Sequence, residues 1–236
     1  MVNHKEAEKY IRRKKRKKFA AIFLSICSTA ITIFIIIAFC VIQKDRFTVT
    51  VDESPSLCLA VDEEKQTLVT KLTAPPLLKA TDTQYRDIPE NIDDGLGSKN
   101  TYSYFAYSFY LGGQSDQENI NYSLAFELSE ADRNLEDAIV IMIIRNGEKK
   151  FYSKENEDGT PKDILDAENR HDEPSKIYTA LPFKENRHII LEPYSIKPGN
   201  FDKYTIVMWI DGWYSNNDMR GGTFQANMKF STLSVV

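Results

Sequence analysis

Residues 120–128 read INYSLAFEL, a stretch in which every even-numbered side chain is apolar or aromatic. Asn121, Ser123 and Glu127 stand between them. Successive side chains of a strand point to opposite faces, so this alternation is typical of a half-buried antiparallel strand. Residues 102–111, YSYFAYSFYL, repeat the pattern with aromatic residues on one face.

The chain on either side of these two stretches continues in the same manner. Residues 138–144, AIVIMII, are continuously apolar and are followed by Asn146-Gly147, a dipeptide that favours a two-residue hairpin turn. Further strands are expected at residues 47–51, 67–72, 149–152, 188–191, 204–210 and 224–233. Many short strands separated by turn residues predict an all-β domain, an antiparallel β-sandwich of jelly-roll or Ig-like form.

Little of this region favours helix or regular structure outside the strands. Only residues 130–136 or 162–167 have the composition for a helical turn or two. Residues 74–100 are rich in Pro, Asp and Gly, and residues 155–174 are strongly acidic, so both predict loops.

The N-terminal residues differ sharply from the β-rich region. Residues 19–42 contain no charged side chain, and 24 residues of helix would span about 36 Å, more than the roughly 30 Å of a bilayer core. A basic run precedes them and predicts a cytoplasmic N-terminus: Arg12, Arg13, Lys14, Lys15, Arg16, Lys17 and Lys18. We therefore expect a basic cytoplasmic tail (1–18), a transmembrane helix (19–42) and an extracellular β-sandwich domain (43–236). A cleaved signal peptide is the alternative, but its apolar region would be shorter, about 7–15 residues.

Charge and cysteine content limit the partners and the compartment. Residues 1–18 contain nine Lys and Arg against two Glu, whereas the rest of the chain contains 21 basic and 32 acidic residues. An acidic body repels phosphate, which argues against nucleic acid as a partner. Only Cys58 follows the apolar run, so the domain has no internal disulfide, as fits a Gram-positive cell surface.

No pattern of catalytic residues or cofactor-binding motif is found. The three histidines form no zinc motif, and no nucleophile elbow or phosphate loop is present. Glu157, Asp158 and Asp163 offer hard oxygen ligands for calcium, although their spacing does not match an EF-hand and a solvated loop explains them equally. Trp213 and Tyr214, at the expected tip of a hairpin, are the candidate binding residues; the alternative is that Trp213 folds back over the end of the sandwich.

Several stretches resemble a family of uncharacterised membrane-anchored proteins of Firmicutes. They are residues 102–111, 121–123 and 135–140, and above all the closing stretch 197–213 followed by 221–224 and 228–230. The resemblance covers roughly residues 100–236 and implies the fold and the cell-surface location, with no activity attached. The order of elements is also distantly similar to the jelly-roll camelysin and TasA group of exported matrix-fibre proteins, except at the N-terminus, where a fibre subunit would carry a cleavable signal.

Together these features predict a non-enzymatic module: a structural, adhesive or partner-binding domain anchored in the cell membrane and exposed outside a Gram-positive cell. The expected partners are the lipid bilayer and a cell-envelope protein or polysaccharide. Two alternatives are an anchored cell-envelope hydrolase, since carboxylates are plentiful, and an exported TasA-like fibre subunit. No residue pattern selects an oligomeric state.

Overall fold

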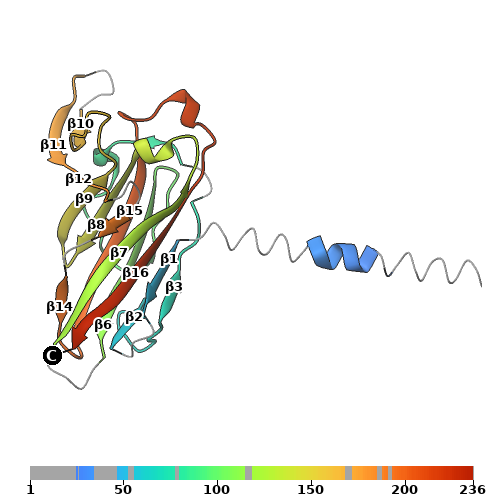
Figure 1. Ribbon diagram of the computed structural model, residues 1–236, viewed down its shortest axis with the longest axis vertical. Helices are drawn as coiled ribbons and strands as arrows, with labels where there is room; N and C mark the ends of the chain where they lie inside the picture. The colour runs from blue at the N-terminus through green and yellow to red at the C-terminus, as the bar shows by residue number, and fades with distance from the viewer. Residues whose placement is uncertain are drawn as a thin grey trace, which may run out of the picture. The chain divides into compact units, whose positions relative to one another are not determined.

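A computed structural model of the chain describes Ser25 and residues 27–34, 47–52, 56–77, 80–114, 119–167, 172–184, 188–190 and 193–235. The chain divides into two compact units, Met1–Asp45 and Arg46–Val236. Figure 1 shows the strands of the second unit.

The expected transmembrane helix over residues 19–42 is corrected by the structure. No helix in the part of the chain that the structure describes is long and apolar enough to cross a membrane. Within that range, Ser25 and residues 27–34 are helical, and eight consecutive helical residues extend only about 12 Å. The other residues of the range, and the basic residues 12–18, lie outside the described residues.

The second unit is built mainly from two sheets. The first contains, in spatial order, β13 (His188–Ile190), β7 (Ile120–Ala131), β16 (Phe224–Val235), β1 (Thr48–Val51) and β3 (Lys71–Thr73), with β14 (Tyr194–Ile196) also on β7. The second contains β12 (Leu181–Pro182), β9 (Glu148–Ser153), β8 (Ile139–Arg145), β15 (Phe201–Asp211), β6 (Tyr104–Gly113) and β2 (Leu57–Ala60), with β4 (Asp82–Thr83) on β15 and β5 (Gly97–Ser98) on β6.

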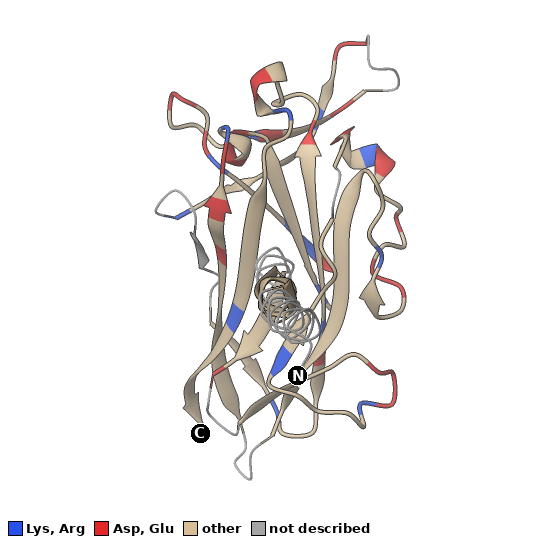
Figure 2. Cartoon of the chain, turned by 90° about the vertical axis from the view of Figure 1, so that its right-hand side faces the viewer, with Lys and Arg blue, Asp and Glu red and all other residues tan. Residues whose placement is uncertain are grey.

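Smaller elements complete the domain. A separate two-stranded sheet is formed by β10 (Asp163–Asp166) and β11 (Ser175–Thr179). Among the described residues, short 3₁₀ turns are formed by η1 (Tyr85–Asp87), η2 (Leu135–Asp137) and η3 (Asn217–Met219). Figure 2 shows that most of the acidic residues drawn in red lie in the connecting loops and at the strand ends.

The two main sheets pack face to face, which confirms the predicted all-β sandwich. The core between them joins Leu124 and Phe230 of the first sheet to Phe109, Ile141 and Ile206 of the second. Residues of β7 alternate between this core and the outer surface, as the period-two pattern predicts. Most strand pairs are antiparallel, but β1 runs parallel to β16, β12 to β9 and β4 to β15. The jelly-roll or Ig-like connectivity stays a prediction.

The continuous apolar run of β8 has a structural cause, because the second sheet is covered on both faces. Ile141 and Ile143 point into the core between the sheets. Val140 and Met142 point outward into a second core, which Ile164 of β10 helps to close. A strand buried on both faces needs apolar residues at every position.

The turn after β8 is confirmed, whereas other local predictions fail. Asn146 and Gly147 both have positive φ, 50° and 85°, and β8 and β9 pair antiparallel across them. Residues 57–60 form β2, which was not predicted. Residues 163–166, for which the composition predicts a loop or a helical turn, form β10 because Ile164 is buried in the second core.

Candidate functional site

The predicted contact residues, Trp213 and Tyr214, are engaged inside the protein. Both are half-buried, and the Tyr214 ring packs against the main core. The Tyr214 hydroxyl donates a 2.7 Å hydrogen bond to the carbonyl of Asp163. The Trp213 backbone N–H donates to the Asp211 carboxylate at 2.9 Å, and the indole nitrogen is buried. Their binding role stays a prediction, and their geometry places them at the end of the sandwich where β15 ends.

A buried charged cluster lies beside these two rings. Asp211 has no exposed surface, and burial raises the pKa of its carboxyl to about 6. Lys162 is 5% exposed; its ammonium donates to the carbonyl of Asp137, and burial lowers its pKa. The same ammonium lies 4.9 Å from the centroid of the Tyr214 ring. These contacts are internal and make the cluster part of the fold.

The three candidate calcium ligands do not form a shared site: Asp163 and Asp158 bind other side chains or the backbone, and Glu157 is exposed. Asp163 forms an ion pair with Lys176 at 2.9 Å. Asp158 accepts hydrogen bonds from the hydroxyl and the N–H of Thr160, which lower the pKa of its carboxyl. Glu157 is exposed. In the described ranges, no group of three or more His, Cys, Asp or Glu side chains is placed to hold a metal ion.

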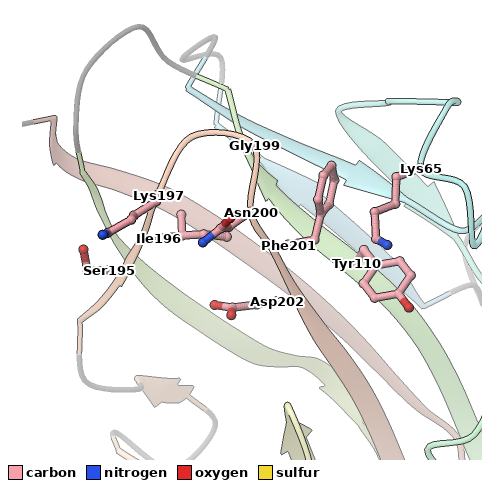
Figure 3. A pocket seen from close by; sticks show the side chains of 9 residues that line it. All are labelled: Lys65, Tyr110, Ser195, Ile196, Lys197, Gly199, Asn200, Phe201 and Asp202. Atoms are coloured by element: carbon pink, nitrogen blue, oxygen red, sulfur yellow. The ribbon is translucent and has the colours of Figure 1, made fainter.

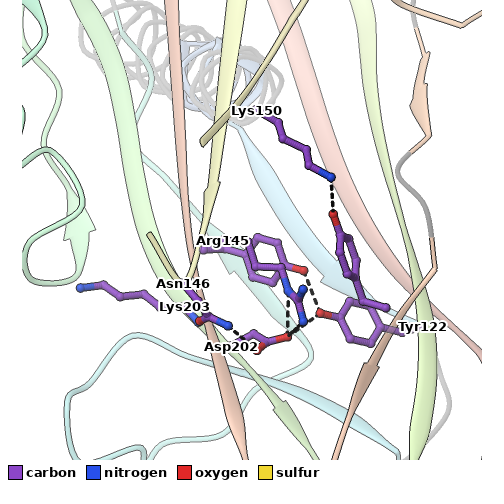
Figure 4. A network of polar contacts seen from close by, with 8 residues as sticks. Tyr122, Arg145, Asn146, Lys150, Asp202 and Lys203 are labelled. Carbon is purple, nitrogen blue, oxygen red and sulfur yellow. Dashed lines mark hydrogen bonds and ion pairs between the residues drawn. The ribbon is translucent and has the colours of Figure 1, made fainter. Parts of the chain in front are cut away.

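At the opposite end of β15, a network of polar groups surrounds the carboxylate of Asp202 (Figure 4). One carboxylate oxygen accepts from the Tyr122 hydroxyl at 2.7 Å and from the Arg145 guanidinium at 2.8 and 3.1 Å. The other accepts from the Asn146 side-chain amide at 2.7 Å. The Tyr204 hydroxyl lies 2.8 Å from that of Tyr122. Burial raises the pKa of both tyrosines, which keeps their hydroxyls protonated.

A surface hollow of about 500 Å³ lies next to this network and shares Asp202 with it (Figure 3). It is open to solvent rather than enclosed. Its lining comes from the β2–β3 connection, β6, β14, the turn before β15 and the start of β15: Lys65, Tyr110, Ser195, Ile196, Lys197, Gly199, Asn200, Phe201 and Asp202.

Lys65 is held at the hollow by its own turn. The carboxylate of Asp62 accepts hydrogen bonds from the N–H groups of Gln66 and Thr67, at 2.8 and 3.1 Å. These bonds, led by that of Gln66, lower the pKa of the Asp62 carboxyl. Lys65 adopts a positive φ of 55°, and its ammonium lies 4.4 Å from the centroid of the Tyr110 ring.

Lys197 is presented by a second turn, Lys197-Pro198-Gly199-Asn200. The Asn200 N–H donates to the Lys197 carbonyl at 3.0 Å, and Gly199 has a φ of 77°. Proline followed by a glycine with positive φ is the arrangement of a type II turn. The turn is tied to β6, because Gly199 donates to the carbonyl of Gly113 and Gly113 donates to that of Asn200.

Phe201 forms a wall of the hollow because its strand neighbour has no side chain. Phe201 lies opposite Gly112 in the β15–β6 register, and its ring packs where a side chain of residue 112 would be. The ring meets Tyr110 edge to face, with centroids 6.3 Å apart. The hollow thus has two aromatic rings beside the ammonium of Lys65.

The side chains that line the hollow offer positive charge and hydrogen-bond donors. Neither Lys65 nor Lys197 forms an ion pair with any residue in the described part of the chain. The carboxylate of Asp202 is occupied at both oxygens and balanced by Arg145, so it is poorly placed to act as a base or nucleophile. The available groups are donors and positive charges.

Sequence reasoning did not identify this hollow. The Pro-Gly pair at 198–199 was a usable signal, because it predicts a tight turn that would display the flanking Lys197. Nothing local indicates that Lys65 lies near Phe201, since the two are brought together only by the pairing of β2 and β15 with β6.

Comparison of the chain with protein-family models finds no match, and comparison with curated proteins finds none. The resemblance to a Firmicutes surface family therefore stays a prediction, and the function is argued from the geometry alone.

Proposed function

We propose that the β-sandwich is a non-catalytic binding module and that it binds an anionic partner in the hollow at the start of β15. The observation that carries this proposal is that two lysines, Lys65 and Lys197, line one hollow from opposite sides, and neither has an ion-pair partner among the described residues (Figure 3). A partner that supplies the missing negative charges would form charge-assisted hydrogen bonds there.

The surroundings of the hollow support a local binding site over general charge attraction. Residues 19–236 contain 21 basic and 32 acidic side chains, so the average field of this part of the chain repels anions. The Asp62 turn fixes the backbone at Lys65 and the Pro-Gly turn fixes the backbone at Lys197, which reduces the entropy lost on binding. The Lys65 ammonium is also held against the Tyr110 ring before a partner arrives.

The rigid Asp202 network supports a binding role over a hydrolytic one. A general acid or base needs a free proton site within reach of the substrate. At this hollow, the buried carboxylate already accepts from Tyr122, Arg145 and Asn146. Its evident contribution is to fix the start of β15, and with it Phe201. The location of the module outside the cell stays a prediction.

The test is binding of the full chain to surfaces that carry polygalacturonate, polyglycerol phosphate or poly-L-glutamate. The double variant Lys65→Gln/Lys197→Gln is compared with Lys71→Gln/Lys229→Gln, which removes two exposed lysines of the first sheet and changes the net charge equally. We expect the wild type to bind at least one polyanion, and the first variant to bind about tenfold or more weakly, since tenfold corresponds to about 1.4 kcal/mol. Equal losses in both variants, or no binding to any of the three, would contradict the proposal.

A further inference from the structure

Two features of the hollow, besides its charge, bear on which anion it takes. The amide of Asn200 and the hydroxyl of Ser195 line it, and neither side chain has a hydrogen-bond partner among the described residues. An amide and a hydroxyl each donate and accept, so they match the hydroxyl groups of a polyol. The rings of Tyr110 and Phe201 add apolar surface next to these polar groups.

The backbone around the hollow is already hydrogen-bonded. Gly199 donates to the carbonyl of Gly113, Gly113 donates to that of Asn200, and Asn200 donates to that of Lys197. In one common mode of peptide recognition, an extended peptide pairs its main chain with a free strand edge. The rim at residues 197–200 has few main-chain groups left for such pairing, so it favours recognition through side chains.

The spacing of charges argues against a densely charged polymer. Glu63 accepts a hydrogen bond from the Tyr110 hydroxyl at 3.1 Å, which places a carboxylate beside the rim. Asp202 places a second, neutralised carboxylate in the lining. Closely spaced phosphates would be repelled by these two carboxylates. A polymer with one anionic group per one or two residues would place its charges at the lysines and its hydroxyls between them.

From these contacts we infer that the ligand is an anionic, hydroxyl-rich polymer, in which separate carboxylate or phosphate groups bind Lys65 and Lys197 at the two sides of the hollow (Figure 3) and neighbouring hydroxyls bind Asn200 and Ser195. This inference rests on the proposed function and specifies its ligand class. Because the hollow is open, a segment of a long chain crosses it and its ends stay in solvent.

The test uses the full chain and four immobilised probes: polygalacturonate, polyglycerol phosphate, neutral dextran and poly-L-glutamate. Dissociation constants are measured for the wild type, Lys65→Gln/Lys197→Gln and Asn200→Ala. We expect the dissociation constant for one of the two anionic polyols to be at least tenfold lower than that for poly-L-glutamate, and no binding to dextran. Preference for polygalacturonate identifies a carboxylate as the anionic group, and preference for polyglycerol phosphate identifies a phosphodiester.

The Asn200→Ala variant separates the ligand class from simple charge attraction. We expect it to weaken binding to the preferred polyol severalfold while leaving the residual binding to poly-L-glutamate unchanged. If poly-L-glutamate binds as tightly as the polyols, with the same dependence on Lys65 and Lys197, the ligand class is wrong and the proposed function stands. If none of the anionic probes binds, the proposed function falls as well.

Discussion

The hydroxyl of Tyr122 donates a 2.7 Å hydrogen bond to the carboxylate of Asp202, and this bond joins the two sheets of the sandwich across their buried interface. Tyr122 belongs to β7 in the first sheet, and Asp202 belongs to β15 in the second. The Tyr122 side chain is fully buried and Asp202 is 8% exposed. A hydrogen bond between two buried side chains holds the two sheets in one relative position beside the hollow.

Replacement of Tyr122 by phenylalanine is expected to lower the free energy of unfolding by about 1–3 kcal/mol, because it leaves a buried carboxylate with one donor fewer. Urea-induced unfolding measures the change. Tyr194→Phe is the matched control, since the Tyr194 hydroxyl is a partner only of Lys150, at 3.4 Å, in the described network, and its removal is expected to cost little. Similar decreases in the free energy of unfolding for both variants would show that the Tyr122–Asp202 hydrogen bond contributes no more to stability than the Tyr194–Lys150 contact.

Replacement of Asp211 by asparagine is expected to stabilise the protein at neutral pH. Burial raises the pKa of this carboxyl from 3.8 to about 6, so the folded state binds a proton more tightly than the unfolded state does. The stability that protonation contributes is complete below about pH 4 and is lost as the pH rises to about 6. At pH 7 the buried charge costs on the order of 3 kcal/mol, of which asparagine should recover about 1–2 kcal/mol.

Thermal unfolding between pH 4 and pH 7 measures this effect. We expect the gain of Asp211→Asn to be present at pH 7 and absent or reversed at pH 4. Asp82→Asn, a change at an exposed neighbour, should shift the melting temperature little at either pH. A constant difference between Asp211→Asn and the wild type across this range would contradict the pKa assignment.

Replacement of Gly112 by alanine is expected to displace the Phe201 ring. The added Cβ would overlap that ring and lie 2.8 Å from the sulfur of Cys58, so the ring must move. We expect a loss of about 1–3 kcal/mol in stability, as is usual for overpacking, and weaker binding of the anionic probe. Gly212→Ala is the control, because its Cβ would meet its nearest neighbour at 3.5 Å. Unchanged binding by Gly112→Ala would remove Phe201 from the site.

Replacement of Asp62 by alanine is expected to release Lys65 from the hollow. The variant loses the acceptor for the N–H groups of Gln66 and Thr67, so the turn that carries Lys65 is less restrained. Binding of the anionic probe should weaken severalfold, because the ammonium is no longer held in place before the ligand arrives. Glu64→Ala removes an exposed acidic residue of the same turn and should leave affinity unchanged. Greater affinity of Asp62→Ala for the anionic probe would mean that repulsion by the Asp62 charge outweighs its positioning of Lys65, and would contradict this prediction.

Much of the sandwich is predictable from local pattern, because burial on one face leaves a period of two in the sequence. Residues 120–128 and the Asn146-Gly147 turn show this directly. The strand at 163–166 was missed because its single core residue, Ile164, stands among acidic neighbours. The apolar run at 19–42 satisfied the length rule for a membrane span, yet the structure describes in it only a short helical stretch.

The hollow could not be predicted from local sequence patterns, because its residues are far apart in the sequence. Lys65 and Lys197 are 132 positions apart, and they line one hollow because β2 and β15 both pair with β6. Trp213 and Tyr214 are adjacent aromatic residues at a turn, a pattern that favours a contact site. Whether such rings face solvent or close the sandwich depends on what packs behind them, and here Asp163 and Lys162 contact Tyr214 from a distant segment.

The most direct measurement is the rate of lysine acetylation, residue by residue, in the full chain with and without saturating anionic polyol. The account predicts that the ligand protects Lys65 and Lys197, whereas the exposed Lys71 and Lys229 react at unchanged rates. Protection of Lys71 and Lys229 to the same extent, or no protection of Lys65 and Lys197 when the ligand is bound, would contradict it.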